Sequence, residues 1–192
     1  IAGTGEYSGA PFEQEVKAMK KLGTIEKQKK LIAALRERNL PVIFVSVIAN
    51  AIGFIPKWGF ILEMTRLKAP KGNLDNPRVK ELCEVIPELG RLPEEPLFYH
   101  TSHSPLTGNN LEHYLRNLGV KDIVLTGWTA HSTLYNSLIQ FTDRYFSVVI
   151  PKDATGAPER DADCADIVLR KMARMWGLVT TVDDVIVHLP DN

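Results

Sequence analysis

The stretch 119–155 constrains the fold more than any other part of the chain. An apolar run of branched residues, 123–125, ends at Gly127, and a helical pattern begins near Ser132. A second apolar run follows at 146–150. A strand, a crossover helix and another strand at this spacing predict two parallel strands of one sheet.

This unit also predicts where chemistry takes place. Ligands of open parallel sheets bind at the carboxyl ends of the strands, and a helix that begins there directs free backbone amides toward them. The turn from Trp128 to Thr133 occupies that position. It is therefore the first candidate for a functional site.

The same patterns continue through the rest of the chain. They predict strands over 42–48, 97–100 and 182–189, a helix that begins at Pro11 or Thr24 and ends at Asn39, and helices over 79–85, 111–118 and 161–176. Strands that alternate with helices, without a linker or an internal repeat, indicate a single doubly wound α/β domain over 1–192. Residues 1–12 are typical of a loop, and 49–78 of a long loop with large apolar side chains that packs as a lid or an interface.

Two helices allow more detailed predictions. Thr24 is suited to cap the first, and its basic stretch 27–30 is interpreted as a solvated face. In the helix over 161–176, four apolar side chains are expected to face inward; they are Ile167, Val168, Met172 and Met175. Asp153 is expected to brace the end of the strand before it.

Composition excludes several classes of function. The 23 basic residues balance the 23 acidic ones, so neither nucleic acid nor an anionic membrane is an expected partner. The apolar runs are strand-length, and the first residues lack the pattern of a signal peptide, so we expect a soluble cytoplasmic protein. Cys83 and Cys164 have no paired spacing and are expected to be buried, inert thiols without a disulfide.

Three stretches together resemble the isochorismatase-like hydrolases, also called cysteine hydrolases. They are EPLFYHTSHSPLTGNNLEHYLRNLGVKDIVLTGWTAHSTLYNS at 95–137, SVVIPKDATGAP at 147–158 and MWGLVTTVDDVI at 175–186. The resemblance implies a six-stranded, mostly parallel sheet with helices on both faces, assembled as homodimers or homotetramers. It also implies a small-molecule substrate and no cofactor.

The resemblance implies site residues as well. The family uses an Asp as general acid or base, a Lys, and a Cys nucleophile; here the Lys position falls on His100 and the Cys position on Thr133. A cis peptide bond is implied between Trp128 and Thr129, and the amides of Thr129 and Thr133 are implied to stabilise an oxyanion. His103, Ser104 and His131 are expected to line the pocket, with Trp128 as a wall.

The family's first strand and its Asp have no counterpart in this sequence, which begins in what resembles the following loop. A central strand missing from a parallel sheet would leave two rows of unpaired backbone groups in the core. We therefore expect the natural protein to extend upstream of Ile1.

Each candidate also has a structural interpretation. Thr133 is either a nucleophile, with His131 or His100 as its base, or a helix-start residue with a capping role. His100 either orients substrate and shuttles a proton, or is a hydrogen-bonded histidine at a strand end. Three histidines in two loops also raise the possibility of zinc, but the family's metal ligands are absent after the strand over 42–48, so no metal is predicted.

Two functions follow from these observations. The first is a hydrolase that acts on an enol ether or an amide-like bond of a small molecule without a cysteine nucleophile. Vinyl ether hydrolysis needs a proton donor and water, and no acyl-enzyme. The alternative is a catalytically degenerate member that binds a small molecule or serves as a scaffold.

Overall fold

A computed structural model describes residues 17–47, 75, 77, 80, 83–100 and 103–190. The strands are β1 (Phe44–Val47), β2 (Leu97–His100), β3 (Asp122–Val124), β4 (Gly127–Trp128), β5 (Ser147–Pro151), β6 (Thr155–Gly156) and β7 (Leu178–Thr180). The longer helices are α2 (Thr24–Glu37), α5 (Leu111–Asn117), α6 (Tyr135–Thr142), α7 (Ala162–Met175) and α8 (Val182–Val187). The short helical turns are η1 (Pro87–Leu89), η2 (Ala130–Leu134), η3 (Lys152–Ala154) and η4 (Glu159–Asp161).

Every strand pairing among the described residues is parallel. β1 pairs with β2, β5 lies between β3 and β7, and β4 pairs with β6. The predicted strand–helix–strand unit is confirmed, because β3 and β5 are parallel neighbours joined through α6. The described strands form three separate sheets, however, and not the single six-stranded sheet that was expected.

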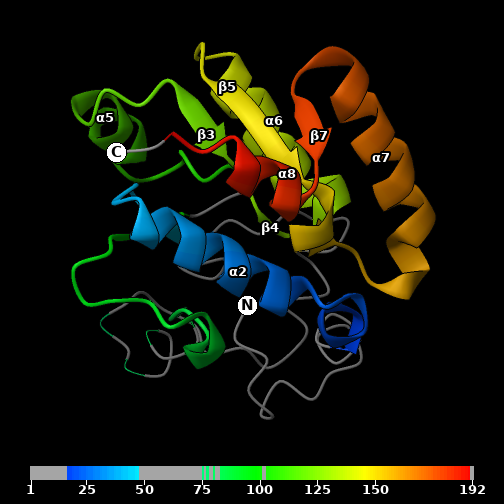
Figure 1. Ribbon diagram of the computed structural model, residues 1–192, viewed down its shortest axis with the longest axis horizontal. Helices are drawn as coiled ribbons and strands as arrows, with labels where there is room; N and C mark the ends of the chain where they lie inside the picture. The colour runs from blue at the N-terminus through cyan, green and yellow to red at the C-terminus, as the bar shows by residue number, and fades with distance from the viewer. Residues whose placement is uncertain are drawn as a thin grey trace.

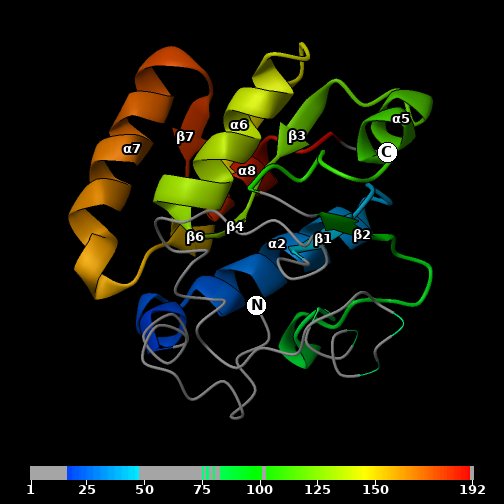
Figure 2. The ribbon, with the colours of Figure 1, turned by 180° about the vertical axis from the view of Figure 1, so that it is seen from behind.

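Helices cover both faces of the β3–β5–β7 sheet (Figures 1 and 2). Val148 and Ile150 of β5 join α5, α6 and α7 in the larger hydrophobic cluster. Val149, between them, packs instead against the cluster formed with α2 and α8. Successive side chains of a strand point to opposite faces, so one short apolar strand anchors both helical layers.

The segment predicted as a last strand, 182–189, is a helix. The strand comes earlier, at β7, and α8 then begins after Thr181, whose hydroxyl accepts a hydrogen bond from the Asp184 amide. The Asp153 carboxylate accepts a second one from the Val182 amide at 2.8 Å. Two capped amides outweigh the strand preference of a branched apolar run, and Asp153 braces the start of α8.

The predicted inward face of α7 is wrong at two of its four positions. Met172 is fully buried and Val168 packs against the core, but Ile167 is 56% exposed and Met175 is 64% exposed. The buried positions recur at Ala165, Val168 and Met172, which lie on one side of a helix with 3.6 residues per turn. Ile167 and Met175 are therefore on the outside of this helix.

The lysines of the basic stretch 27–30 are partly solvated, as predicted, with side-chain exposures of 38%, 44% and 56%, and the stretch also attaches α2 to the rest of the molecule. Lys27 lies 3.0 Å from the Asp153 carboxylate, and Lys30 lies 2.6 Å from that of Asp183. The buried Gln28 amide donates to the Ala154 carbonyl at 3.0 Å. These partners hold α2 against η3 and α8.

The N-terminal end of α2 and the region before η1 also differ from expectation. Gly23 is the N-cap residue of α2, and the Thr24 hydroxyl makes no capping hydrogen bond. Within the predicted helix 79–85, Lys80 is helical but Cys83 lies in a turn. The loops predicted over 1–12 and 49–78 lie outside the described residues, apart from Asp75 and Pro77.

A buried ion pair joins α2 to the loop before β2. The Arg36 guanidinium donates to both oxygens of the Glu95 carboxylate, each at 2.8 Å, and only 9% of Glu95 is exposed. The Leu92 amide donates to the same carboxylate. The hydrogen bonds from Arg36, with that of Leu92, hold the pKa of Glu95 below its ordinary value in spite of burial.

This pair predicts a loss of stability in acid. The stabilisation from Glu95 is present above the pKa of an unfolded glutamate, about 4.3, and is lost as the pH falls through the lower pKa of the folded state. We expect Glu95→Gln to cost about 1.5–3 kcal/mol of unfolding free energy at pH 7 and to flatten the dependence on pH between about 5 and 3. Urea unfolding measured across this pH range tests the prediction, and Glu88→Gln, which changes an exposed glutamate, is the control. An unchanged pH profile in Glu95→Gln would contradict the assignment.

Candidate functional site

The turn that carries Thr133 begins at β4 and is held in place by β6. Gly127 and Trp128 pair with Thr155 and Gly156, and the Thr155 hydroxyl donates to the Gly127 carbonyl at 2.6 Å. The peptide bond from Trp128 to Thr129 is cis, as the resemblance implies. The segment that sequence patterns assign to a tight turn thus starts with a short strand.

Trp128 is buried, and its indole lies directly against Gly156 of β6. The ring packs with Ala18, Met19 and Ile25. A methyl group built on Gly156 would come within 2.9 Å of the Trp128 ring and 2.8 Å of a Leu22 methyl. Real Cβ atoms do not approach so closely, so glycine is needed here because of the ring beside it.

We expect Gly156→Ala to destabilise the fold by about 1–3 kcal/mol, the usual cost of overpacking a filled site. The reason is the clash with Trp128, so the smaller ring of Trp128→Phe should relieve part of that loss. Denaturant unfolding of both single variants and the double variant measures the coupling. Additive losses would show that the ring is not what excludes a side chain at Gly156.

After the cis bond, the chain enters η2, a short π-helical turn over Ala130–Leu134. The Thr129 carbonyl accepts from the amides of Ser132 and Leu134, and the hydroxyls of Thr129 and Ser132 lie 3.0 Å apart. Thr133 is half-buried, and its carbonyl accepts from the Ser137 hydroxyl. The N-cap residue of η2 is Thr129 rather than Thr133, so the predicted capping role does not apply to Thr133.

His131 faces the start of α7. Its Nε2 lies 3.9 Å from Oδ2 of Asp161, and the Arg160 guanidinium lies 3.2 Å from the same oxygen. Its Nδ1 is buried and has no hydrogen-bond partner among the described residues. The pairing with Asp161 links η2 to α7 and was not predicted, because the two residues are separated by the whole of α6 and β5.

The other main candidate, His100, is the last residue of β2 and is buried. The loop after it carries His103 and Ser104, and both are half-buried. The Ser104 hydroxyl accepts from the Leu106 amide at 3.2 Å, which closes a local turn. Ser104 was predicted to line the pocket. In the structure its hydroxyl makes a hydrogen bond within its own loop.

Asn109 organises this loop and was missed by sequence reasoning. Its amide nitrogen donates to the carbonyls of Tyr99 and Pro105, both at 2.8 Å, and its oxygen accepts from the Leu111 amide. These three bonds tie the loop to the residue before His100 and to the start of α5. An asparagine two residues before a predicted helix is the signal that could have found it.

The loop after β2 and the turn after β4 share one hydrophobic cluster. Phe98 and Leu106 pack against the cluster that contains Ala130 and Leu134. The apolar residues next to His100 and those next to Thr133 are thus part of a single core. This packing connects the two loops that sequence analysis assigned to the site.

The two thiols lie elsewhere. Cys83 is buried, and burial raises the pKa of its thiol. Cys164 is exposed on α7, contrary to the expected burial, and Asp163 beside it raises the pKa of that thiol. Neither cysteine is on the 127–134 turn. Among the residues that the structure describes, no group of three metal-ligating side chains converges.

Comparison with known proteins identifies the family. A model of the isochorismatase domain matches residues 12–184, which is most of the chain. The chain is a member of the isochorismatase family. An isochorismatase-family protein from Burkholderia thailandensis is 26% identical, with a TM-score of 0.69 over 85% of this chain and 81% of that one. N-carbamoylsarcosine amidase from Thermoplasma acidophilum has the same fold at 22% identity, with a TM-score of 0.65 over 83% of each chain.

A curated relative of this isochorismatase-family chain is the secreted isochorismatase effector Isc1 of Verticillium dahliae. The two are 31% identical over 113 residues, which is 55% of this chain and 57% of that protein. The match thus spans a little over half of the relative. No described helix is long and apolar enough to cross a bilayer. The cytoplasmic location and the homo-oligomer stay predictions.

Proposed function

We propose that this member of the isochorismatase family hydrolyses a small enol ether by addition of water, without a cysteine nucleophile. The observation that carries the proposal is the residue at the helical turn after β4. Thr133 lies there, and the two cysteines lie on other segments. We assign the family's cysteine position to Thr133 and its lysine position to His100.

Enol ether hydrolysis fits this set of residues. A proton is added to the double-bond carbon, water adds to the resulting oxocarbenium ion, and the hemiketal separates into a carbonyl compound and an alcohol. The reaction requires proton transfer but no covalent intermediate with the enzyme. Cleavage of an amide-like C–N bond through an acyl-enzyme would instead require Thr133 to be activated by a base.

Each residue of the site has a role in the proposal. His100, at the carboxyl end of β2, shuttles a proton or orients the substrate. The backbone amides of Thr129 and Thr133 donate to the hemiketal hydroxyl oxygen, which gains negative charge as it gives up its proton and the alcohol leaves. Trp128, His103, Ser104 and His131 border the pocket. A histidine and backbone amides can perform these roles without a metal or a cofactor.

The experiment compares enol ethers with amides. The protein is incubated with isochorismate, a simple alkyl enol ether, nicotinamide and an N-carbamoyl amino acid, and pyruvate, aldehyde or ammonia release is measured. We expect turnover of an enol ether and its retention in Thr133→Ala, since water is the nucleophile. Loss of turnover in a folded Thr133→Ala protein would show that the hydroxyl attacks, and exclusive turnover of amides would reject the enol ether.

The same assay addresses the non-catalytic alternative. Saturable binding of isochorismate by calorimetry, without product formation at any pH between 5 and 9, would indicate a binding or scaffold protein. The changed residues at the lysine and cysteine positions are the feature that motivates this alternative. We favour hydrolysis because the curated relative is itself an isochorismatase.

A further inference from the structure

Asp161 is the N-cap residue of α7, but its side chain makes no capping hydrogen bond. An aspartate at this position usually accepts from an amide of the first turn, which contributes about 1 kcal/mol to stability. The Asp161 carboxylate instead lies 3.2 Å from the Arg160 guanidinium and 3.9 Å from Nε2 of His131. Residues that break a local rule of this kind are expected at functional sites.

His131 belongs to the η2 turn, between the two residues whose backbone amides are assigned to the site, Thr129 and Thr133. Turns with π-helical geometry are rare and frequently occur at functional sites. η2 packs against α7, and Ala130, directly before His131, is completely buried. The chain that carries the imidazole is therefore held firmly beside the proposed site.

The two nitrogens of His131 have different surroundings. Nε2 lies nearest the Asp161 carboxylate, whereas Nδ1 is buried and has no hydrogen-bond partner among the described residues. An ionised carboxylate only accepts hydrogen bonds, so it favours the tautomer with hydrogen on Nε2 and a lone pair on Nδ1. The separation of 3.9 Å exceeds a hydrogen bond, but catalytic hydrogen bonds are often long until substrate binds.

A lone pair on Nδ1 suits a water molecule as its partner. A buried polar atom without a partner costs about 1–3 kcal/mol, and a water that donates to Nδ1 removes that cost. Enol ether hydrolysis requires such a contact, because a base must take a proton from the water that attacks the oxocarbenium ion. The roles proposed for His100 and for the backbone amides leave this water without a base.

We propose that His131 is the general base that activates the water, and that Asp161 positions it; this inference rests on the proposed function. Nδ1 takes a proton from the water as the water oxygen bonds to the oxocarbenium carbon. The imidazolium, stabilised by Asp161, then gives this proton to the alcohol oxygen as its bond to carbon breaks. The hydroxyl proton of the hemiketal returns to His100, which supplied the proton added to carbon, so both histidines are restored.

Asp161→Asn tests the positioning role, since asparagine is as good an N-cap residue as aspartate. Its amide can donate to Nε2, which places the imidazole hydrogen on Nδ1 instead. We expect kcat for the enol ether to fall by about 10-fold to 10⁴-fold, the larger value being typical of a catalytic histidine in the wrong tautomer. KM should change little, because the carboxylate does not contact the substrate.

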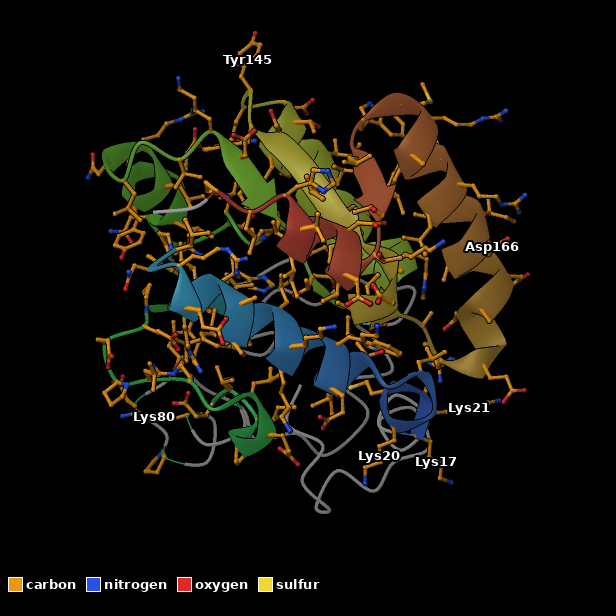
Figure 3. All side chains as sticks on the ribbon, viewed as in Figure 1. Lys17, Lys20, Lys21, Lys80, Tyr145 and Asp166 are labelled. Atoms are coloured by element: carbon orange, nitrogen blue, oxygen red, sulfur yellow. The ribbon has the colours of Figure 1, made fainter. Side chains whose placement is uncertain are left out.

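His131→Gln tests the base itself and should lower kcat by about 10²–10⁴-fold. Adding Asp161→Asn to His131→Gln should cause no further loss, because the carboxylate acts only through the imidazole. The matched control is Asp166→Asn, which should leave the kinetics unchanged. Asp166 is on the same helix, but Figure 3 shows it pointing away from the body of the protein.

A measurement without substrate separates this inference from the proposed function. Nitrogen-15 NMR of the His131 ring reports which nitrogen carries the hydrogen. We expect Nε2 in the wild type and in Asp166→Asn, and a loss of that preference in Asp161→Asn. Circular dichroism establishes that each variant is folded.

Three results would overturn the inference while enol ether turnover stands. They are hydrogen on Nδ1 in the wild type, unchanged kcat in either folded single variant, and additive losses in the double variant. If the wild type hydrolyses no enol ether, the proposed function fails and the base role fails with it. The NMR measurement then still decides whether Asp161 orients His131.

Discussion

Replacing His100 by alanine should lower kcat/KM for the enol ether by about 10²–10⁴-fold, the usual contribution of a positioned proton-transfer group. His100 ends β2 and is buried at the carboxyl end of a parallel strand, where an imidazole can act on a bound ligand. Steady-state kinetics across pH 5 to 9 measures the effect. His100→Gln keeps a polar group and should retain part of the substrate binding, seen as a smaller change in KM than in kcat.

The control for this prediction is His113→Ala, which removes an exposed histidine of α5 and should leave kinetics unchanged. Because His100 is buried, its loss also affects folding, so thermal unfolding of each variant is measured beside the kinetics. Full turnover by a folded His100→Ala protein would remove His100 from the mechanism. A parallel loss of folded protein and of activity, without a change in kcat per folded molecule, would assign it a structural role.

Leu138→Ala should lower the unfolding free energy by about 3–5 kcal/mol, the range for leucines whose removal leaves a cavity. Leu138 is 0% exposed and lies on α6, in the cluster with Ile150 of β5 and Met172 of α7. Its side chain therefore contributes to the contact among three elements. Urea unfolding of wild type and variant measures the loss.

The comparison for Leu138→Ala is Leu118→Ala. Leu118 follows α5 and is nearly half exposed, so its truncation should cost less than about 1 kcal/mol. Equal losses in the two variants would show that the cluster is not the main stabilising core. Leu138 lies on α6 and is not one of the candidate site residues, so Leu138→Ala should reduce enzymatic activity in proportion to the unfolded fraction and no further.

Sequence patterns predict an element well where its apolar residues follow a single repeat, of two residues for a strand or 3.6 for a helix. The β3–α6–β5 unit, β2 and α5 all appear where their apolar repeats indicate. They fail at α8, where a branched apolar run is also compatible with a helix once Thr181 and Asp153 cap its first amides. They fail again on α7, because a helix with apolar residues on more than one side does not reveal which side meets the sheet.

The candidate site, like the fold, could be predicted only in part. The turn after β4 and the loop after β2 can be selected from the sequence, since ligands of parallel sheets bind beyond strand ends. The long-range partners of the residues that support those loops could not be predicted. Asn109 bonds back to Tyr99, and His131 approaches Asp161 thirty positions later. Neither distance along the chain nor residue type specifies such partners.

By itself, the sequence indicated a parallel α/β domain and membership of the isochorismatase family, and it selected two loops as the candidate site. Those conclusions depend on periods of two and 3.6 residues and on short motifs, which are local properties of the chain. Only the tertiary structure decided that Arg36 binds Glu95, that Lys27 binds Asp153 and that Ile167 faces outward. The reason is that a side chain's partner and its burial depend on how whole elements pack, and that packing brings together residues far apart in the sequence.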